Sequence, residues 1–355
     1  MTSLRALEKI ARNPDSVEKE DLVLILKENS KEFNEKLFKT ADEIRERYVG
    51  NEVHVRALIE FSNYCRKNCL YCGLRRSNRE LKRYRMTPQE IIKRAEISAR
   101  MGARTIVLQS GEDLYYTREI LSDIIRKIKK LDVAVTLSVG ERTYEEYEAW
   151  KIAGADRFLM RHETANRELY RKLHPDTPFE ERVKCLHWLK KLGYEVGAGN
   201  IVGLPGQTVE DLADDLLFVK ELDADMVGIG PFIPHPQTPL RNEKGGDFLT
   251  SLKMIALARI LIPDTNIPAT TAMGTIHPNG RQIALKCGAN VIMPVMTPSP
   301  YRPLYQLYPG KICVFESDTK CIPCVFHMIK ALGREVGKSY GSRKRVTLSS
   351  STSCS

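Results

Sequence analysis

The sequence lacks any long uninterrupted run of apolar residues. In 355 residues, no stretch reaches the ~18 consecutive apolar side chains that indicate a membrane-spanning helix. The N-terminal stretch MTSLRALEKIARNPD is charged and contains no apolar core of a secretory signal. We therefore expect a cytoplasmic protein with no membrane partner.

The sequence also lacks a recognisable nucleic-acid-binding module. Its formal net charge of +10 is compatible with anionic partners. The Lys and Arg residues, however, are spread along the chain and are not interleaved with aromatic residues as stacking sites require. We interpret most of this charge as solvated helix faces, and we expect no nucleic-acid partner.

The cysteines do not form a disulfide framework. They are nine in number, which is odd, and six of them fall into two tight groups. In a cytosolic protein such grouping indicates metal binding rather than disulfide bonding. Cys185 and Cys287 lie apart from these groups on predicted helices, where we expect buried core thiols.

Short apolar or β-branched runs alternate with helical patterns along most of the chain. Residues 1–50 carry apolar residues at helical spacing. Eight predicted strands follow, at 53–61, 105–111, 134–140, 157–164, 195–204, 226–233, 267–273 and 290–296. We predict an α/β fold, a complete (β/α)8 TIM-type barrel over 51–300. N-terminal helices occupy 1–50, a cysteine-bearing C-terminal extension occupies 301–340, and a disordered tail occupies 341–355.

Two of the predicted helices have strong start signals. Residues 87–90 read TPQE and residues 177–180 read TPFE. Each places a Thr before a Pro at the first helical position, with a Glu that completes a capping box. We therefore predict that Thr87 and Thr177 cap the helices that follow them.

Three cysteines follow the first predicted strand in the stretch SNYCRKNCLYCGL. Cys65, Cys69 and Cys72 have the spacing C-x3-C-x2-C, with no fourth cysteine nearby. Three thiolates can hold three irons of a cubane 4Fe–4S cluster and leave the fourth iron open, where an amine and a carboxylate of a small molecule can bind. The alternative is a zinc site, which would need a fourth ligand from the distant C-terminal cysteine group.

This motif, with the aromatic Tyr71 before the last cysteine, resembles the radical S-adenosylmethionine (SAM) enzymes. The stretches RHETANRELYRKLHPDTPFEERV and GNIVGLPGQT resemble the subgroup that contains biotin synthase and methylornithine synthase. The stretches GIGPFIPHPQTPL and PSPYRPLYQLYPGK are similar to FeFe-hydrogenase maturases of the HydE type. This likeness runs along the barrel and into the C-terminal segment. It implies that a 4Fe–4S cluster reductively cleaves SAM to methionine and a 5′-deoxyadenosyl radical.

The resemblance also assigns roles to individual residues. It implies that the three cysteines bind the cluster and that Glu163 shares in catalysis. The stretch QSGED after the second strand resembles the Gly-Gly-Glu motif that holds the SAM amino group, and an arginine suits the SAM carboxylate through a bidentate pair. The implied cofactor-binding residues are Tyr71, Gln109, Ser110, Gly111, Glu112, Arg161, Glu163, Arg182 and Tyr305.

Polar residues on the predicted strands indicate a hydrated cavity inside the barrel. If the apolar residues of the first strand face the helices, Arg56 and Glu60 point inward. A polar interior is costly unless water or a polar ligand fills it. A closed Arg56–Glu60 pair without a ligand is the alternative. We expect the cavity to be lined by Arg56, Thr136, Ser138, Thr270, Thr271 and Met293.

A second cysteine group, Cys313, Cys321 and Cys324, follows the eighth predicted strand. Some maturases of the HydE type carry an accessory Fe–S cluster there, so the resemblance implies a second cluster, either 2Fe–2S or 4Fe–4S. The alternative is three thiols without metal. Nothing in the sequence ties this group to the cavity.

The resemblance implies a maturase in assembly of the H-cluster, the active-site cluster of FeFe hydrogenase. Its implied substrate is a small cysteine-bearing iron carbonyl–cyanide complex, whose sulfur the adenosyl radical attacks. The implied partners are a tyrosine-cleaving radical SAM maturase, a GTPase scaffold and an external reductant. The alternatives are a radical SAM mutase or synthase on a small amino acid, like methylornithine synthase, a biotin synthase-like enzyme, and a basic Fe–S carrier. No predicted strand contains a cysteine, which argues against sulfur insertion.

Overall fold

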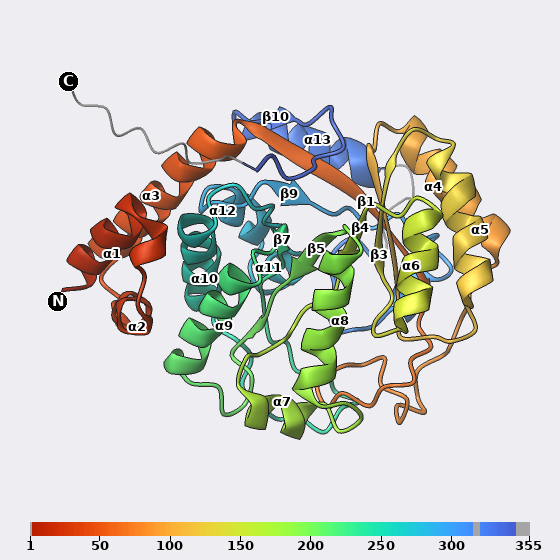
Figure 1. Cartoon of the computed structure of the whole chain (residues 1–355), viewed down its shortest axis with the longest axis horizontal. Coiled ribbons are helices and arrows are strands. Elements are labelled where there is room, and N and C mark those ends of the chain that lie inside the picture. The colour runs from red at the N-terminus through yellow and green to blue at the C-terminus, as the bar shows by residue number, and fades with distance from the viewer. Residues whose placement is uncertain (1, 315–319, 346–355) are drawn as a thin grey trace.

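The computed structural model describes residues 2–314 and 320–345. Three helices come first, α1 (Ser3–Arg12), α2 (Lys19–Lys27) and α3 (Lys31–Val49), with a 3-10 turn, η1 (Pro14–Ser16), after α1. They lie at one side of the molecule, where α3 contacts α10 and α2 contacts α9 (Figure 1). None of the helices in the described part of the chain combines the length and the hydrophobicity needed to span a bilayer.

A parallel sheet forms the centre of the molecule. Its strands are β1 (Glu52–Ser62), β2 (Thr105–Ser110), β3 (Ala134–Ser138), β4 (Arg157–Leu159), β5 (Glu195–Ala198) and β7 (Met226–Val227), paired in that order. β1 also pairs in parallel with β9 (Val291–Ile292) and β10 (Glu335–Val336). The helices that cover the sheet are α4 (Pro88–Arg100), α5 (Arg118–Lys129), α6 (Tyr144–Ile152), α8 (Phe179–Lys191), α9 (Val209–Glu221) and α10 (Phe248–Leu261) (Figure 1). The α/β prediction is therefore confirmed, with parallel strands and helices alternating along the chain.

Shorter elements complete the fold. They are α7 (Arg167–Leu173), β6 (Ile201–Val202), β8 (Gly230–Pro231), α11 (Thr271–Ile276), α12 (Gly280–Leu285), η2 (Arg302–Leu304) and α13 (Cys321–Ala331). The predicted strand at 267–273 is wrong, because α11 begins at Thr271 within that range. In its place, single parallel bridges join Met226 to Asn266 and Pro268 to Val291. Pro268 has no N–H for a ladder, which limits strand pairing here.

The predicted strands at 195–204 and 226–233 are each interrupted near the middle. β6 and β8 pair with each other in a separate two-stranded sheet, beyond β5 and β7. The interruption falls at Gly199, whose φ is +142°. A Cβ atom there would lie 2.0 Å from the carbonyl oxygen of Gly228, so the close approach of the two backbones requires glycine.

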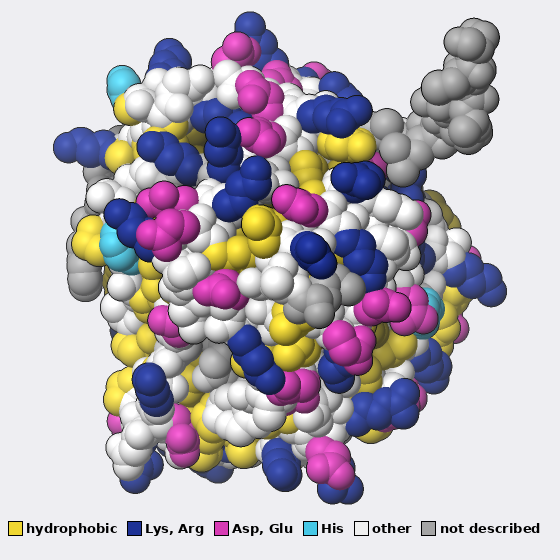
Figure 2. Space-filling model, turned by 90° about the vertical axis from the view of Figure 1, so that its left-hand side faces the viewer, with side chains coloured by type: hydrophobic (Ala, Val, Ile, Leu, Met, Phe, Trp, Pro, Cys, Tyr) yellow, Lys and Arg dark blue, Asp and Glu magenta, His cyan; other side chains and the backbone are white. Residues whose placement is uncertain are grey.

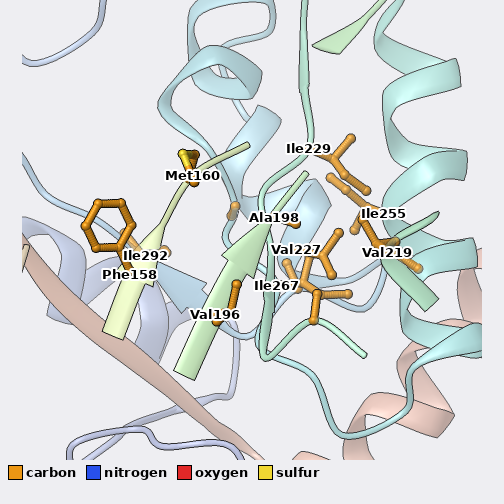
Figure 3. Close-up of a cluster of buried hydrophobic side chains, with 14 of the residues drawn as sticks. Phe158, Met160, Val196, Ala198, Val219, Val227, Ile229, Ile255, Ile267 and Ile292 are labelled. Atoms are coloured by element: carbon orange, nitrogen blue, oxygen red, sulfur yellow. The ribbon is translucent and has the colours of Figure 1, made fainter. Parts of the chain in front are cut away.

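The main hydrophobic core lies between the sheet and the surrounding helices. Figure 3 shows Val227 of β7 near Val219 of α9 and Ile255 of α10. Along β1 the alternation is as the sequence predicts, with Val55, Ala57, Ile59 and Phe61 all in this core. Leu58 lies instead in a small separate cluster with Val107 and Val295. Cys185 and Cys287 are buried in the main core, which confirms the prediction for these two thiols.

One of the two predicted helix caps is confirmed. Thr87 Oγ1 accepts from the backbone N of Glu90 at 3.2 Å, and the Glu90 carboxylate accepts from the backbone N of Thr87 at 2.7 Å. The prediction for Thr177 is wrong, because Pro178 occupies the N-cap of α8 and no side chain caps that helix. Thr177 Oγ1 instead accepts a hydrogen bond from Lys67 Nζ, so the loop after β1 uses the hydroxyl that the cap would have needed.

A C-terminal strap, residues 337–345, crosses the end of the sheet where the strands begin. The guanidinium of Arg56 donates to the carbonyl oxygen of Gly341 at 2.9 Å, and that of Arg157 donates to the carbonyl oxygen of Tyr340 at 2.9 Å. Arg343 pairs with Asp264 at 2.6 Å. Residues 341–345, which we expected in a disordered tail, are therefore fixed to the strands of the sheet and their loops. Residues 346–355 lie outside the described residues.

Candidate active site

The cluster loop, residues 63–86, follows β1 and carries the first cysteine group. Asn63 Nδ2 braces it by donating to the carbonyl oxygens of Lys82 (2.9 Å) and Leu304 (2.8 Å). The Arg83 guanidinium donates to four further backbone carbonyls of the same loop. Buried carbonyls satisfied in this way hold a loop without regular secondary structure in one shape. It presents three half-buried thiols, Cys65, Cys69 and Cys72.

These three thiols share one electrostatic environment. Burial raises the pKa of Cys69, and the neighbouring Cys72 and Cys65 raise it further. Burial, followed by the effect of Cys65, raises the pKa of Cys72 to about 12. Three adjacent thiolates therefore need a cationic centre to offset their charge, and an iron–sulfur cluster is such a centre. Within residues 2–314 and 320–345, no three His, Cys, Asp or Glu side chains converge closely enough for a single metal ion.

Tyr71, between the second and third cysteines, reaches His174 at the C-terminal end of α7. Its hydroxyl lies 2.8 Å from Nε2 of His174. Nδ1 of His174 lies 3.1 Å from the carbonyl oxygen of Tyr170. His174 thus donates from Nδ1 and accepts from Tyr71 at Nε2, which ties the cluster loop to α7.

The predicted SAM-binding stretch after β2 divides into two parts. Gln109 and Ser110 line a central cavity. Gly111 packs on the cluster loop, because a Cβ atom there would lie 2.1 Å from the carbonyl oxygen of Tyr64. The Glu112 backbone N lies 3.3 Å from Cys65 Sγ, and its buried carboxylate pairs with Arg66 at 2.5 Å. Gly111 and Glu112 therefore lie against the cluster loop and outside the cavity lining.

Arg161, Glu163 and Arg182 converge on the cavity, as the resemblance implies. Arg161 Nη2 lies 3.3 Å from Glu163 Oε2. Glu163 has a φ of +70°, which is unfavourable for a residue with a side chain, and the backbone of the segment at Gly199 fixes it by a 3.0 Å hydrogen bond. Arg182 Nη1 donates to the carbonyl oxygen of Arg161 at 3.0 Å.

Sequence reasoning missed the residue that holds Arg182, namely Glu141. This carboxylate, which follows β3, accepts from Arg182 Nε at 2.8 Å and from Lys67 Nζ at 2.6 Å. Burial alone would raise the pKa of Glu141, but Arg182 and Lys67 outweigh burial and lower it to about 2. Glu141 thus joins the cluster loop to the cavity wall. Its only sequence signal is its position, in the polar stretch after a predicted strand.

The cavity has a volume of about 270 Å³. Of the predicted substrate residues it includes Ser138, Thr270, Thr271 and Met293. Thr270 Oγ1 and Glu163 Oε2 are both buried, and neither has a hydrogen-bond partner among the described residues. Buried polar atoms of this kind are normally satisfied by a ligand or by water, so the cavity is suited to a polar ligand.

Two predicted cavity residues, Arg56 and Thr136, do not line the cavity. Arg56 is fully buried, and its guanidinium binds the C-terminal strap and the sulfur of Met226. Thr136 is also fully buried, and its hydroxyl has no partner among the described residues. The alternative, a closed Arg56–Glu60 pair, is not formed, since Glu60 pairs with Lys311. The strap supplies carbonyl acceptors for Arg56, which sequence periodicity could not reveal.

The C-terminal extension closes one side of the cavity. Tyr305 is buried, and its hydroxyl accepts from Gln109 Nε2 at 3.1 Å. Lys311 reaches the carboxylate of Glu60 inside the barrel. Glu60 also receives a 3.2 Å hydrogen bond from Thr297 Oγ1. The extension therefore belongs to the cavity wall, and Lys311 is a second residue that sequence reasoning missed.

The second cysteine group lies behind that wall. Cys313, Cys321 and Cys324 all border one small hollow, together with Thr271 and Met293. Thr271 and Met293 also line the central cavity, so the two spaces share a wall. Cys321 is buried at the start of α13, whereas Cys324 is exposed. Residues 315–319, between Cys313 and α13, lie outside the described residues.

Comparisons with known proteins agree with this geometry. The Radical SAM superfamily matches residues 59–219. The structure is similar to the crystal structure of methylornithine synthase (PylB), with a TM-score of 0.83, 28% identity and coverage of 94% of this chain and 97% of that one. It shares its fold with the hydrogenase maturase HydG, with a TM-score of 0.80, 21% identity and coverage of 95% and 76%. The parallel α/β fold and the three-cysteine loop thus define a radical SAM enzyme, a class that carries a 4Fe–4S cluster and uses SAM.

The relatives found by sequence identify the family within the radical SAM class. The FeFe hydrogenase maturase subunit HydE of Thermotoga maritima is 67% identical over 346 residues, which is 98% of this chain and 99% of that protein. The 3-methylornithine synthase of Methanosarcina acetivorans is 31% identical over 280 residues, or 78% and 79% of the two chains. This chain belongs to the HydE family of FeFe hydrogenase maturases.

Proposed function

We propose that this chain binds a 4Fe–4S cluster through Cys65, Cys69 and Cys72 and cleaves SAM beside it. The observation that carries the proposal is the position of the thiols next to a polar cavity: Cys65 Sγ lies 3.3 Å from the backbone N of Glu112, two residues after Ser110 of the cavity lining. When bound, the cluster supplies the electron that cleaves SAM to methionine and the 5′-deoxyadenosyl radical.

The residues around the cavity would hold and orient SAM. Arg161 suits its carboxylate, and Oε2 of Glu163, which accepts no hydrogen bond and has Arg161 at ion-pair distance, suits its ammonium group or ribose hydroxyls. Gln109 and Ser110 line the same space, and Tyr305 limits it on the side of the C-terminal extension. Glu141 and Lys67 would hold Arg182 in place, which preorganises the site before SAM arrives.

The substrate we propose is a small cysteine-bearing iron carbonyl–cyanide complex, whose sulfur the adenosyl radical attacks on the way to the H-cluster. The 67% identity to a HydE protein supports this choice over a methylornithine synthase-like mutase, at 31%. Such a polar complex would fit below SAM, near Ser138, Thr270, Thr271 and Met293. The proposed partners are a tyrosine-cleaving radical SAM maturase, a GTPase scaffold and an external reductant, all in the cytoplasm.

Three finer features belong to the same proposal. The sheet would close into a complete eight-stranded barrel over 51–300, supported by the bridges at Asn266 and Pro268. The extension at 301–340 would act with the barrel as one unit, because Lys311 binds Glu60. Cys313, Cys321 and Cys324 would hold a second cluster, supported by their common hollow.

Loss of one cluster ligand tests the function. In Cys65→Ala, only two thiolates remain for the cubane. We expect loss of the 4Fe–4S spectroscopic signal, of reductive 5′-deoxyadenosine formation, and of activation of apo-hydrogenase in a reconstituted maturation assay. The matched control is Cys185→Ala, which removes a buried thiol of α8 outside the cluster loop. Formation of 5′-deoxyadenosine at the wild-type rate in Cys65→Ala would contradict the assignment.

A further inference from the structure

The cluster loop is rich in positive charge. Residues 63–86 contain eight Lys or Arg residues and one Glu, a formal charge of +7 out of +10 for the whole chain. On the face seen in Figure 2, by contrast, Lys and Arg side chains alternate with Asp and Glu. Glu112, Asp113, Glu141 and Asp176 from outside the loop pair with four of its cations, which reduces the formal charge from +7 to +3. The remaining positive charge attracts acidic partners.

Several of these cations are available to a partner. Five of the eight are exposed, namely Arg66, Arg76, Arg79, Lys82 and Arg85. Arg79 and Lys82 form no ion pair with any described residue. The other three are paired, Arg66 with Glu112, Arg76 with Asp176 and Arg85 with Asp113. The carbonyl of Lys82 is held by Asn63, so this part of the loop lies close to the first cysteine.

An apolar patch adjoins the cations. It consists of Tyr64, Leu114 and Tyr115, which are 37%, 52% and 52% exposed. The guanidinium of Arg85 lies 3.9 Å from the ring centre of Tyr64 and 4.8 Å from that of Tyr115. Asp113 fixes this guanidinium with hydrogen bonds of 2.7 and 3.0 Å. Aromatic and arginine side chains grouped in this way are typical of the centre of a protein interface, and charged residues are typical of its rim.

The apolar patch is connected directly to the proposed cluster ligands. Tyr64 precedes Cys65 in the chain, and a Cβ atom on Gly111 would lie 2.8 Å from Cys65 Cβ. Leu114 follows the Glu112–Asp113 segment, whose first backbone N lies 3.3 Å from Cys65 Sγ. A protein bound at the patch therefore contacts Tyr64, the residue directly before the first thiol of the loop.

We propose that the apolar patch and the surrounding cations form the docking surface for a small acidic ferredoxin that delivers the electron for SAM cleavage. The proposal rests on the proposed radical SAM function, which needs one external electron per cleavage. One electron leaves the reduced ferredoxin and enters the cluster, and no bond or proton is transferred in this step. Charge complementarity selects an acidic carrier, and a patch of three side chains suits a small one, because electron-transfer complexes use small interfaces.

The test is binding of a purified acidic ferredoxin to the reconstituted protein, measured by calorimetry at low salt. We expect the double variant Arg79→Glu/Lys82→Glu to bind about tenfold more weakly than the wild type, with a smaller dependence on salt. Leu114→Ser/Tyr115→Ser should weaken binding similarly without changing the salt dependence. The matched control is Lys36→Glu/Arg126→Glu, two exposed cations on α3 and α5 without a described ion pair, which should bind within twofold of wild type.

A second measurement separates this proposal from the function on which it rests. Dithionite, a small chemical reductant, needs no docking surface. We expect SAM cleavage with dithionite to be equal in the wild type and all three double variants, while cleavage driven by ferredoxin falls in the two patch variants. Unchanged ferredoxin binding in both patch variants would overturn the docking surface. Absence of cleavage by the wild type with dithionite would instead overturn the proposed function.

Discussion

Glu141→Gln tests the carboxylate that joins the cluster loop to the cavity wall. The substitution keeps the size of the side chain but removes the charge that Lys67 and Arg182 share. The pKa of Glu141 is lowered from 4.5 to about 2, and a tenfold change in a proton-binding constant corresponds to about 1.4 kcal/mol. The folded state should therefore lose about 3 kcal/mol at pH 7, a large part of the stability of a typical domain.

The pH dependence of this loss has a definite sign. Because the pKa of Glu141 is lower in the folded state, its contribution is present above about pH 4.5 and is lost as the pH falls toward about 2. At pH 3.5 the difference between wild type and variant should be about 1.4 kcal/mol smaller than at pH 7. Below pH 2 the side chain at position 141 should contribute equally to the free energy of unfolding in the two proteins.

Urea unfolding of the purified proteins at pH 7 and pH 3.5 measures both quantities. Glu148→Gln is the matched control, since Glu148 is exposed on α6 and has no described ion pair; its unfolding free energy should change by less than about 0.5 kcal/mol. An unfolding free energy of Glu141→Gln equal to that of wild type at pH 7 would refute the reasoning. So would a difference that stays constant between the two pH values.

Three further predictions concern SAM, the cavity wall and the second cysteine group. Arg182→Ala should weaken SAM binding by about 1.5–3 kcal/mol, the loss of a charge-assisted hydrogen bond, with the cluster retained; an unchanged calorimetric affinity would remove Arg182 from the site. Lys311→Met leaves the buried carboxylate of Glu60 without its cation and should cost about 3–5 kcal/mol in urea unfolding, whereas a loss below about 1 kcal/mol would mean that the pair is not formed. Triple substitution of the second cysteine group by Ala should lower the iron content by one cluster yet keep SAM cleavage within about tenfold of wild type. Collapse of cleavage with the first cluster intact would show that the two sites are coupled.

The sequence predicts the order of strands and helices well, because these elements depend on local patterns of apolar and polar residues. The strand alternation along β1 correctly separates residues facing the helices from Leu58 and Glu60, which face inward. Failures occur where tertiary contacts override a local signal. Thr177 has the pattern of a helix cap, but Lys67, which is 110 residues earlier in the chain, takes its hydroxyl.

The same limit applies to the candidate site. The cysteine spacing and the polar stretches after the strands locate the correct end of the fold. Partners across long sequence separations cannot be read from spacing, and both missed residues depend on them. Lys311 meets Glu60 across 251 positions, and Glu141 meets Lys67 across 74. A buried charge in a predicted strand signals that a counter-charge exists, but not where it is in the chain.

The C-terminal strap has a consequence for the order of biosynthesis. Arg56 is made with the first strand, but the carbonyl of Gly341 that it binds is made 285 residues later. Arg157 likewise depends on Tyr340 for one of its acceptors. A nascent chain that has not yet reached the strap therefore carries two buried guanidiniums without these acceptors at the base of its sheet, at a cost in free energy. The hydrogen bonds at the base of the sheet therefore cannot form until this segment has been synthesised.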